Sequence, residues 1–363
     1  MNRREWKAGI IGLGGIGDYH MNHLAKVENV QIAAICDVNT KAVEQVGDRL
    51  HVPAEKRYSE FTAIIADPDI DFLISGVSNQ FHADILKTAI ACGKPIFSEK
   101  PFTRTMEEAD ELANLYEHNP IPCMIGFSYR YRPCFQYVKQ LVAEGTLGRI
   151  RHIAAHYLQE ENAPMFNKPY TWRFSQAMAG SGILADIGSH MVDAARFFVG
   201  EFVQVSGLMS TFIDRRPDAR TGELREVDVD DFTSFQCILE GGVMGSFYTH
   251  KNAIGTGNQF NVTLFGDLGT VRIAVERPNE VHLTLRAGVN HQLTETCIHL
   301  DGKQFKGMLQ DFVDYLEQKG TTTVPTLIDG YRNQQVLQAI IDSAKDGKSR
   351  TLHTDLTQKE GLV

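Results

Sequence analysis

The chain has 363 residues, 43% of them hydrophobic and 22% charged, with a formal net charge of -9 at pH 7. This length predicts two domains, and the composition is that of a soluble globular protein. The acidic charge argues against a nucleic-acid partner, and no apolar run approaches the roughly 20 residues that cross a membrane. Six scattered cysteines without a C-x-x-C pair, and an N-terminus without an apolar leader, favour the cytoplasm and give little support to structural zinc.

The first third of the chain alternates short apolar strands with helices. Strands are predicted at residues 8–13, 30–36, 72–77, 95–98 and 122–127, and helices from Gly17 and at residues 40–50, 80–92 and 105–118. This alternation indicates βαβ units, and therefore an α/β fold with a doubly wound parallel sheet that is buried on both faces. We expect the domain to span residues 1–127.

A glycine-rich segment follows the first predicted strand. Gly12, Gly14 and Gly17 form a G-x-G-x-x-G pattern, in which the glycines permit a tight turn, close approach of a pyrophosphate and close packing of a helix on the strand. Asp37 lies 20 residues beyond Gly17, where a carboxylate binds the adenosine ribose and repels a 2′-phosphate. The pattern predicts a Rossmann domain that binds NAD rather than NADP; a tight turn with an unrelated surface aspartate is the alternative.

The pattern changes after Arg130. Helices are predicted at residues 133–144, 182–198, 307–318 and 327–345, and strands at residues 149–158, 203–212, 232–239, 243–250, 261–265, 270–274 and 281–286. The partial alternation of apolar and polar residues favours a large open, mainly antiparallel sheet with one covered face. Residues 128–345 are expected to form this second domain, with a tail at residues 346–363 and a solvated loop or insertion in the charged segment 214–230.

Three segments carry a family resemblance. Residues 76–101 contain SNQFH and EKP, residues 126–133 read GFSYRYRP, and residues 182–193 read GILADIGSHMVD. In this order they resemble the Gfo/Idh/MocA family of oxidoreductases. The resemblance implies a Rossmann domain followed by an α/β domain that binds substrate and forms a homodimer or homotetramer. It also implies a cofactor site comprising Gly12, Gly14, Gly15, Ile16, Gly17, Asp37, Ser78, Asn79, His82, Glu99 and Lys100.

Three residues are candidates for catalysis. Lys100 follows a parallel strand at the edge where ligands of doubly wound folds bind, and it could stabilise developing alkoxide charge. Asp186 and His190, four residues apart on a predicted helix, could share one face, with His190 accepting a proton. Asp186 could orient the imidazole, stabilise its charged form or hydrogen-bond a substrate hydroxyl. The resemblance implies these roles. The alternatives are a solvated lysine and a surface ion pair, and a zinc site with His156 lacks ligand-dense spacing.

The substrate site is expected to include Tyr129, Arg130, Trp172 and Arg173 beside Asp186 and His190, because aromatic faces and guanidinium groups suit a hydroxyl-rich or anionic ligand. Simple packing is the alternative for each of the four, and Asp193 is interpreted as structural. The predicted function is NAD-dependent oxidation of a secondary hydroxyl of a sugar or cyclic polyol. The alternatives are transient NAD use in lyase, epimerase or glycosidase chemistry, and a non-catalytic NAD(H) sensor.

Overall fold

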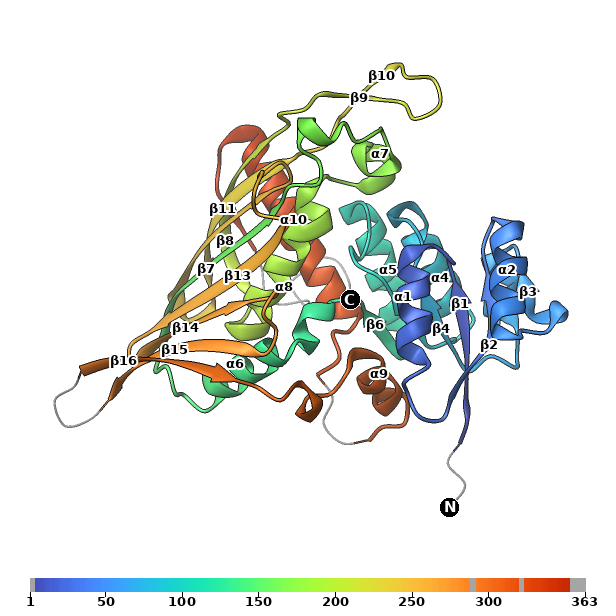
Figure 1. The fold of residues 1–363 in the computed structure, drawn as a ribbon, viewed down its shortest axis with the longest axis horizontal. Helices are drawn as coiled ribbons and strands as arrows, with labels where there is room; N and C mark the ends of the chain where they lie inside the picture. The colour runs from blue at the N-terminus through green and yellow to red at the C-terminus, as the bar shows by residue number, and fades with distance from the viewer. Residues whose placement is uncertain (1–3, 288–291, 320–322, 353–363) are drawn as a thin grey trace. The chain divides into compact units, whose positions relative to one another are not determined.

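The computed structural model describes residues 4–287, 292–319 and 323–352. The chain divides into two compact units, the first made of residues 1–127 and 306–334 and the second of residues 128–305 and 335–363. Figure 1 labels the helices and strands of both units. Within the described ranges, no helix combines the length and the apolar character that crossing a bilayer requires.

The first unit is built on a six-stranded sheet in the order β3-β2-β1-β4-β5-β6, and every pair is parallel. Its strands are β1 (Trp6–Ile11), β2 (Val30–Cys36), β3 (Arg57–Tyr58), β4 (Phe72–Ser75), β5 (Ile96–Ser98) and β6 (Cys123–Ile125). This is the doubly wound order, in which the direction of winding reverses between β1 and β4. The parallel α/β fold expected from the sequence is confirmed.

Helices connect the strands of this sheet: α1 (Gly15–Leu24), α2 (Thr40–Leu50), α3 (Phe61–Ala66), α4 (His82–Ala91) and α5 (Met106–His118). Side chains cap the N-termini of α2 and α5, where Asn39 accepts a hydrogen bond from the Ala42 N–H and Thr105 accepts one from the Glu108 N–H. All four residues of β4 are buried, which explains why this strand is apolar up to its last residue, Ser75.

Residues 306–334 pack with the first unit, whereas the sequence places them in the second domain. The ring of Phe312, in α9 (Met308–Leu316), makes edge contacts with Phe72 and Phe97 at centroid distances of 5.6 and 6.2 Å. The Ile125 N–H donates to the Pro325 carbonyl at 2.8 Å, next to β6. The physical reason is burial of the Phe312 ring, which is fully enclosed there.

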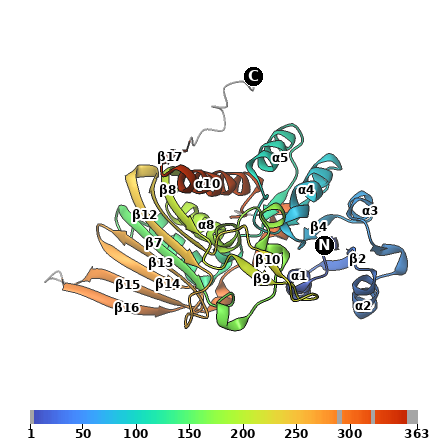
Figure 2. The same ribbon diagram turned by 90° about the horizontal axis from the view of Figure 1, so that it is seen from above.

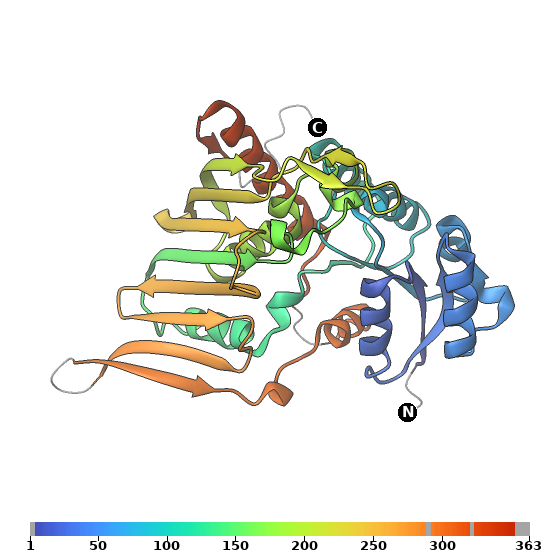
Figure 3. The same cartoon turned by 45° about the horizontal axis from the view of Figure 1, so that its top comes forward.

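The second unit contains a nine-stranded sheet in the order β16-β15-β14-β13-β7-β12-β11-β8-β17. Only the β7–β12 pair is parallel, so the sheet is mainly antiparallel as expected. Figure 3 shows most of its strands side by side. The bounds are β7 (Ile150–Gln159), β8 (Phe202–Ser210), β11 (Phe232–Leu239), β12 (Val243–His250), β13 (Asn258–Gly266), β14 (Gly269–Ala274), β15 (Glu280–Ala287), β16 (Gln292–His299) and β17 (Arg350–Thr351).

One face of this sheet carries α6 (Pro133–Ala143), α8 (Ser189–Phe198) and the C-terminal part of α10 (Leu327–Asp346). Figure 2 shows α8 and α10 on the same side of the strands. The inward residues of the strands and the apolar faces of these helices form one core cluster. The sequence misses β16, because its residues are almost all exposed and carry no apolar periodicity.

The charged segment 214–230 is not a solvated loop throughout. It contains a short antiparallel hairpin of β9 (Arg215–Pro217) and β10 (Leu224–Glu226). The N–H of Gln176, the first residue of α7 (Gln176–Ala179), donates to the carboxylate of Asp228 in this segment at 2.6 Å. Arg216 and Asp230 are buried. The Arg216 guanidinium lies 4.5 Å from the centre of the Phe174 ring and donates to the Asn162 carbonyl at 2.5 Å. A stacked and hydrogen-bonded guanidinium tolerates burial, which charge density alone does not reveal.

Candidate functional site

The glycine loop after β1 has the shape that a pyrophosphate needs. Gly12 has a φ of 90°, and a Cβ on Gly17 would lie 1.9 Å from the Gly12 carbonyl oxygen, so both positions require glycine. A Cβ on Gly14 or Gly15 would have no neighbour within 4 Å. The loop is therefore open above Gly14 and Gly15, at the N-terminus of α1, where backbone amides and the helix dipole favour an anion. These residues fit the phosphates of a dinucleotide.

Asp37 is fixed at the end of β2 by two backbone amides. Its Oδ2 accepts a hydrogen bond from the Leu13 N–H and its Oδ1 accepts one from the Asn39 N–H, both at 2.8 Å. Each carboxylate oxygen can accept a further hydrogen bond, as the two hydroxyls of an adenosine ribose would supply. The next residue, Val38, is 83% exposed and offers no cation for a 2′-phosphate. The arrangement fits NAD.

The loops after β4 and β5 contain the other residues expected at the cofactor. Ser78 and Lys100 are half-buried, and Asn79 is buried at the start of a short helical turn. Ile16, also expected at the cofactor, is exposed in the first turn of α1. His82 differs from expectation. It is 1% exposed, and its ring nitrogens face the carbonyl oxygens of Pro101 at 2.7 Å and of Val77 at 3.2 Å. Both nitrogens are thus engaged within the protein, and His82 joins the two loops.

The Glu99 side chain binds the backbone N–H of Lys100. Its Oε1 lies 2.8 Å from the Nε2 of His20 in α1, and its Oε2 accepts a hydrogen bond from the Lys100 N–H at 3.1 Å. Burial acts to raise the pKa of the Glu99 carboxyl, but His20 and Lys100 outweigh it and hold that pKa below its usual value. A Cβ on Gly126 would lie 2.9 Å from the Glu99 carboxyl carbon, so glycine at this position makes room for Glu99.

In the second unit, Asp186 and His190 lie on consecutive turns that differ from the regular helix expected. Asp186 is within a π-helical turn, Leu184–Gly188, and His190 is in α8 directly after it. The wider turn changes the angular offset between the two side chains, and π turns are frequent at functional sites. His190 is 7% exposed and Asp186 is half-buried.

A buried carboxylate from another part of the chain binds the first N–H groups of this helical segment. Asp230 accepts hydrogen bonds from the N–H groups of Gly182 at 2.6 Å and Leu184 at 3.0 Å, and from the Thr233 hydroxyl at 2.7 Å. A Cβ on Gly182 would lie 1.9 Å from the Asp230 carbonyl oxygen, so glycine permits this close approach. Asp230 precedes β11, and it thereby fixes the start of the helix to the large sheet.

Lys251 contacts Asp186 directly. Its ammonium forms an ion pair with the Asp186 carboxylate, and its side chain is 7% exposed. Lys251 follows β12, and its N–H donates to the Asp231 carbonyl at 3.0 Å. The sheet therefore presents a buried cation to the candidate catalytic aspartate.

Tyr129 packs on His190 with a distance of 4.3 Å between ring centroids. Its hydroxyl lies 2.6 Å from that of Tyr157, and burial raises the pKa of Tyr129. The phenol is therefore neutral at physiological pH and can donate a hydrogen bond. This placement agrees with the expected position beside His190.

Arg130 has a different environment from the one expected for a substrate ligand. Its guanidinium is buried, donates from Nε to both carboxylate oxygens of Asp193 at 3.0 Å, and lies 5.2 Å from the centre of the Phe197 ring. A guanidinium held by a carboxylate and an aromatic ring orients the structure around it. Asp193, interpreted from the sequence as structural, has that role through Arg130.

Trp172 and Arg173 lie together in a short turn between β7 and α7. The Arg173 guanidinium stacks 4.4 Å from the centre of the Trp172 ring. Arg173 also lines a small cavity with Lys251, Asp230 and Asp231. Arg173 thus shares a cavity with the residue that pairs with Asp186.

Sequence reasoning missed Asp230, Asp231 and Lys251. The only sequence signals are an acidic pair directly before a predicted strand and a lone lysine directly after another. Neither signal separates a buried anchor from ordinary surface charge, because the partners are distant along the chain.

The open glycine loop and the fixed Asp37 define a dinucleotide-binding protein, and comparison of the chain with known protein families agrees. A family model described as an oxidoreductase family with an NAD-binding Rossmann fold matches residues 6–127. A second, described as the GFO/IDH/MocA C-terminal domain, matches residues 135–272. The chain belongs to the GFO/IDH/MocA family of NAD-binding oxidoreductases.

Named relatives resemble the chain over nearly its whole length. Levoglucosan dehydrogenase of Pseudarthrobacter phenanthrenivorans is 31% identical, covering 93% of this chain and 95% of the relative. D-apiose dehydrogenase of Rhizobium rhizogenes is 29% identical, with coverages of 96% and 98%. A structure of levoglucosan dehydrogenase in complex with NADH and L-sorbose superposes with a TM-score of 0.90 at 28% identity, covering 97% of this chain and 100% of that one.

Proposed function

We propose that this protein oxidises one secondary hydroxyl of a sugar or cyclic polyol to a ketone and passes the hydride to NAD. The observation that carries the proposal is the helical segment that presents Asp186 and His190, held by Asp230 and Lys251, in a chain with an NAD loop. The dehydrogenase names of the relatives support the substrate class. Neither relative's name indicates lyase, epimerase, glycosidase or sensor function.

The reaction removes a hydride from carbon and a proton from oxygen. NAD, when bound, accepts the hydride. In the proposal, neutral His190 accepts the hydroxyl proton and releases it to solvent, while Lys100 donates a hydrogen bond to the substrate oxygen as negative charge develops. Because the imidazole must be neutral to accept the proton, the rate of oxidation should rise with pH.

Asp186 and Lys251 are proposed to hold and polarise the substrate beside His190. The Asp186 carboxylate can accept hydrogen bonds from substrate hydroxyls, and its contact with the Lys251 ammonium holds that carboxylate in place. The Tyr129 ring packs at a tilt against the His190 ring. Arg130 and His82 are assigned positioning roles, since their polar atoms contact protein groups.

NADH production with a panel of inositols, aldoses, anhydrosugars, sugar phosphates and uronic acids tests the proposal. Lys100→Ala and His190→Ala should each lower kcat about 10²- to 10⁴-fold on the best substrate, with little loss of NADH affinity measured by fluorescence. The double variant should be little worse than the poorer single variant, since the two residues act as a unit. His118→Ala, which changes an exposed histidine, is the control. Retention of more than about a tenth of kcat by both single variants would contradict the assigned roles.

We further propose a cytoplasmic homo-oligomer that assembles through the outer face of the large sheet. All six cysteines are free, which supports a reducing compartment. The outer face exposes apolar side chains from several strands, including Leu208, Met244 and Tyr248 at 68%, 49% and 43%. Such exposure is typical of interfaces. Light scattering should give a mass well above 40.6 kDa, and a monomer at micromolar concentration would contradict the proposal.

A further inference from the structure

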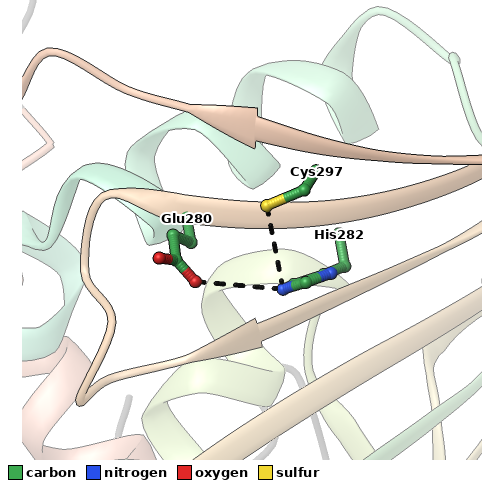
Figure 4. Close-up of side chains that lie close together, drawn as sticks. All are labelled: Glu280, His282 and Cys297. Atoms are coloured by element: carbon green, nitrogen blue, oxygen red, sulfur yellow. Dashed lines mark hydrogen bonds and ion pairs between the residues drawn. The ribbon is translucent and has the colours of Figure 1, made fainter.

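Three side chains with metal-binding donors converge on the outer face of β15 and β16. Glu280, His282 and Cys297 offer one donor atom each, all within 4.8 Å of one another. His282 Nε2 lies 4.0 Å from Cys297 Sγ and 4.0 Å from a Glu280 carboxylate oxygen (Figure 4). The sequence does not predict this cluster, because His282 and Cys297 are 15 residues apart and meet only when the two strands pair.

We propose that Glu280, His282 and Cys297 bind a zinc ion. Thiolate, imidazole and carboxylate are the ligands that zinc takes in proteins, and a thiolate disfavours calcium and magnesium. Tetrahedral zinc would separate these donors by about 3.3–3.6 Å, from its usual bond lengths of about 2.0–2.3 Å. Each pair measured at 4.0 Å therefore has to close by only about half an ångström, which side-chain rotation can supply.

The pairing of the strands gives the site its rigidity. His282 lies directly opposite Cys297, and Glu280 directly opposite His299, so all four side chains share one face of an antiparallel ladder. His299 Nε2 is 3.8 Å from Cys297 Sγ, so a rotamer change would let His299 serve as the fourth ligand. Ligands on paired strands lose little further freedom when the metal binds.

The second nitrogen of His282 faces an acidic group. Glu295 Oε1 is 3.9 Å from His282 Nδ1, and Arg272 forms an ion pair with the same carboxylate. A metal-bound histidine commonly directs its other N–H toward a carboxylate, which fixes the tautomer and ring orientation. Glu295 is placed for that role.

The site would join β15 to the exposed strand at one edge of the nine-stranded sheet. β16 is paired on one side only, and its residues are almost all exposed, so few buried contacts retain it. Zinc bridging the two strands would supply that stability. Zinc would bind the thiolate of Cys297, so the thiol proton would pass to solvent on binding. The site does not depend on the proposed oxidation, since it involves neither Asp186 nor His190.

The full-length protein, purified under reducing, chelator-free conditions, tests the proposal with zinc alone. Competition with a chromophoric chelator should show one tight zinc per chain. Cobalt substituted for zinc should give thiolate charge-transfer absorption and the visible bands of a tetrahedral site. Among the exposed cysteines Cys92 and Cys297, zinc should protect Cys297 alone from a thiol reagent, followed by mass spectrometry.

Variants separate this site from adventitious binding. Cys297→Ser should lower zinc affinity by roughly a hundredfold, because it removes the strongest ligand, and His282→Gln should do the same. Cys92→Ser is the matched control and should bind zinc like the wild type. The thiol-protection result needs no variant, so it decides the question even if a substitution impairs folding. Equal reactivity of Cys297 with and without zinc, or equal zinc affinity of Cys297→Ser and Cys92→Ser, would overturn the proposal.

Discussion

Asp230→Ala tests whether one buried carboxylate holds the catalytic segment in place. The substitution removes the acceptor for two backbone N–H groups at the start of the helix, those of Gly182 and Leu184, and for the Thr233 hydroxyl. Thr233 is fully buried, so water cannot readily replace the lost partner there. The affected segment carries Asp186 and His190.

The expected loss of stability follows from these contacts. A buried donor without a partner costs about 1–3 kcal/mol, and losing a helix N-cap costs about 0.5–2 kcal/mol. Relief of the buried charge offsets part of this, since burial raises the pKa of Asp230. We expect a net loss of about 2–4 kcal/mol in the free energy of unfolding. That is a large share of the roughly 5–15 kcal/mol typical of a protein, yet it leaves the fold intact at 25 °C.

Urea unfolding and steady-state kinetics measure the two consequences. Because the helical segment would lose its anchor, kcat should fall while the affinity for NADH, which binds the first unit, should be unchanged. Glu226→Ala removes an exposed carboxylate from the same charged region and serves as the control. A loss below about 1 kcal/mol together with unchanged kcat would refute the anchoring role.

Three further predictions concern individual contacts. Asp37→Ala should narrow the preference for NADH over NADPH in fluorescence titrations, because the carboxylate no longer repels a 2′-phosphate; a wild type that prefers NADPH would contradict the reasoning. Lys251→Met should lower kcat roughly 5- to 30-fold, because losing the ion pair costs about 1–2 kcal/mol after discounting for the partial exposure of Asp186. Lys251→Arg should partly restore kcat. Equal kcat values for Lys251→Met and the wild type would exclude the ion pair from catalysis. Burial lowers the pKa of His82 below 6.5, so the unfolded state binds more protons than the folded state, and the free energy of unfolding should fall as the pH drops below about 6.5. His82→Gln should make the free energy of unfolding depend less on pH in this range, as measured by unfolding titrations. An unchanged pH dependence would contradict this assignment.

The nucleotide-binding half could be predicted largely from the sequence, because its determinants are local. Strand β2 at Val30–Cys36 and helix α2 at Thr40–Leu50 have the predicted bounds. The turn at Gly12 and Gly17 is required by backbone geometry within six residues, and Asp37 ends the next strand. Such short-range patterns carry their own physical constraints.

Only the tertiary structure decided how the remaining charged residues are used. Arg130 pairs with Asp193 rather than facing solvent, and Lys251 forms an ion pair with Asp186. Asp230 accepts a hydrogen bond from Gly182, which lies 48 residues earlier, at the start of the helical segment. The sequence shows only that these residues are charged. A charged residue can be solvated, or it can be buried with a partner. Their roles depend on partners from other strands and helices, and pairing across such distances leaves no periodic signal in the sequence.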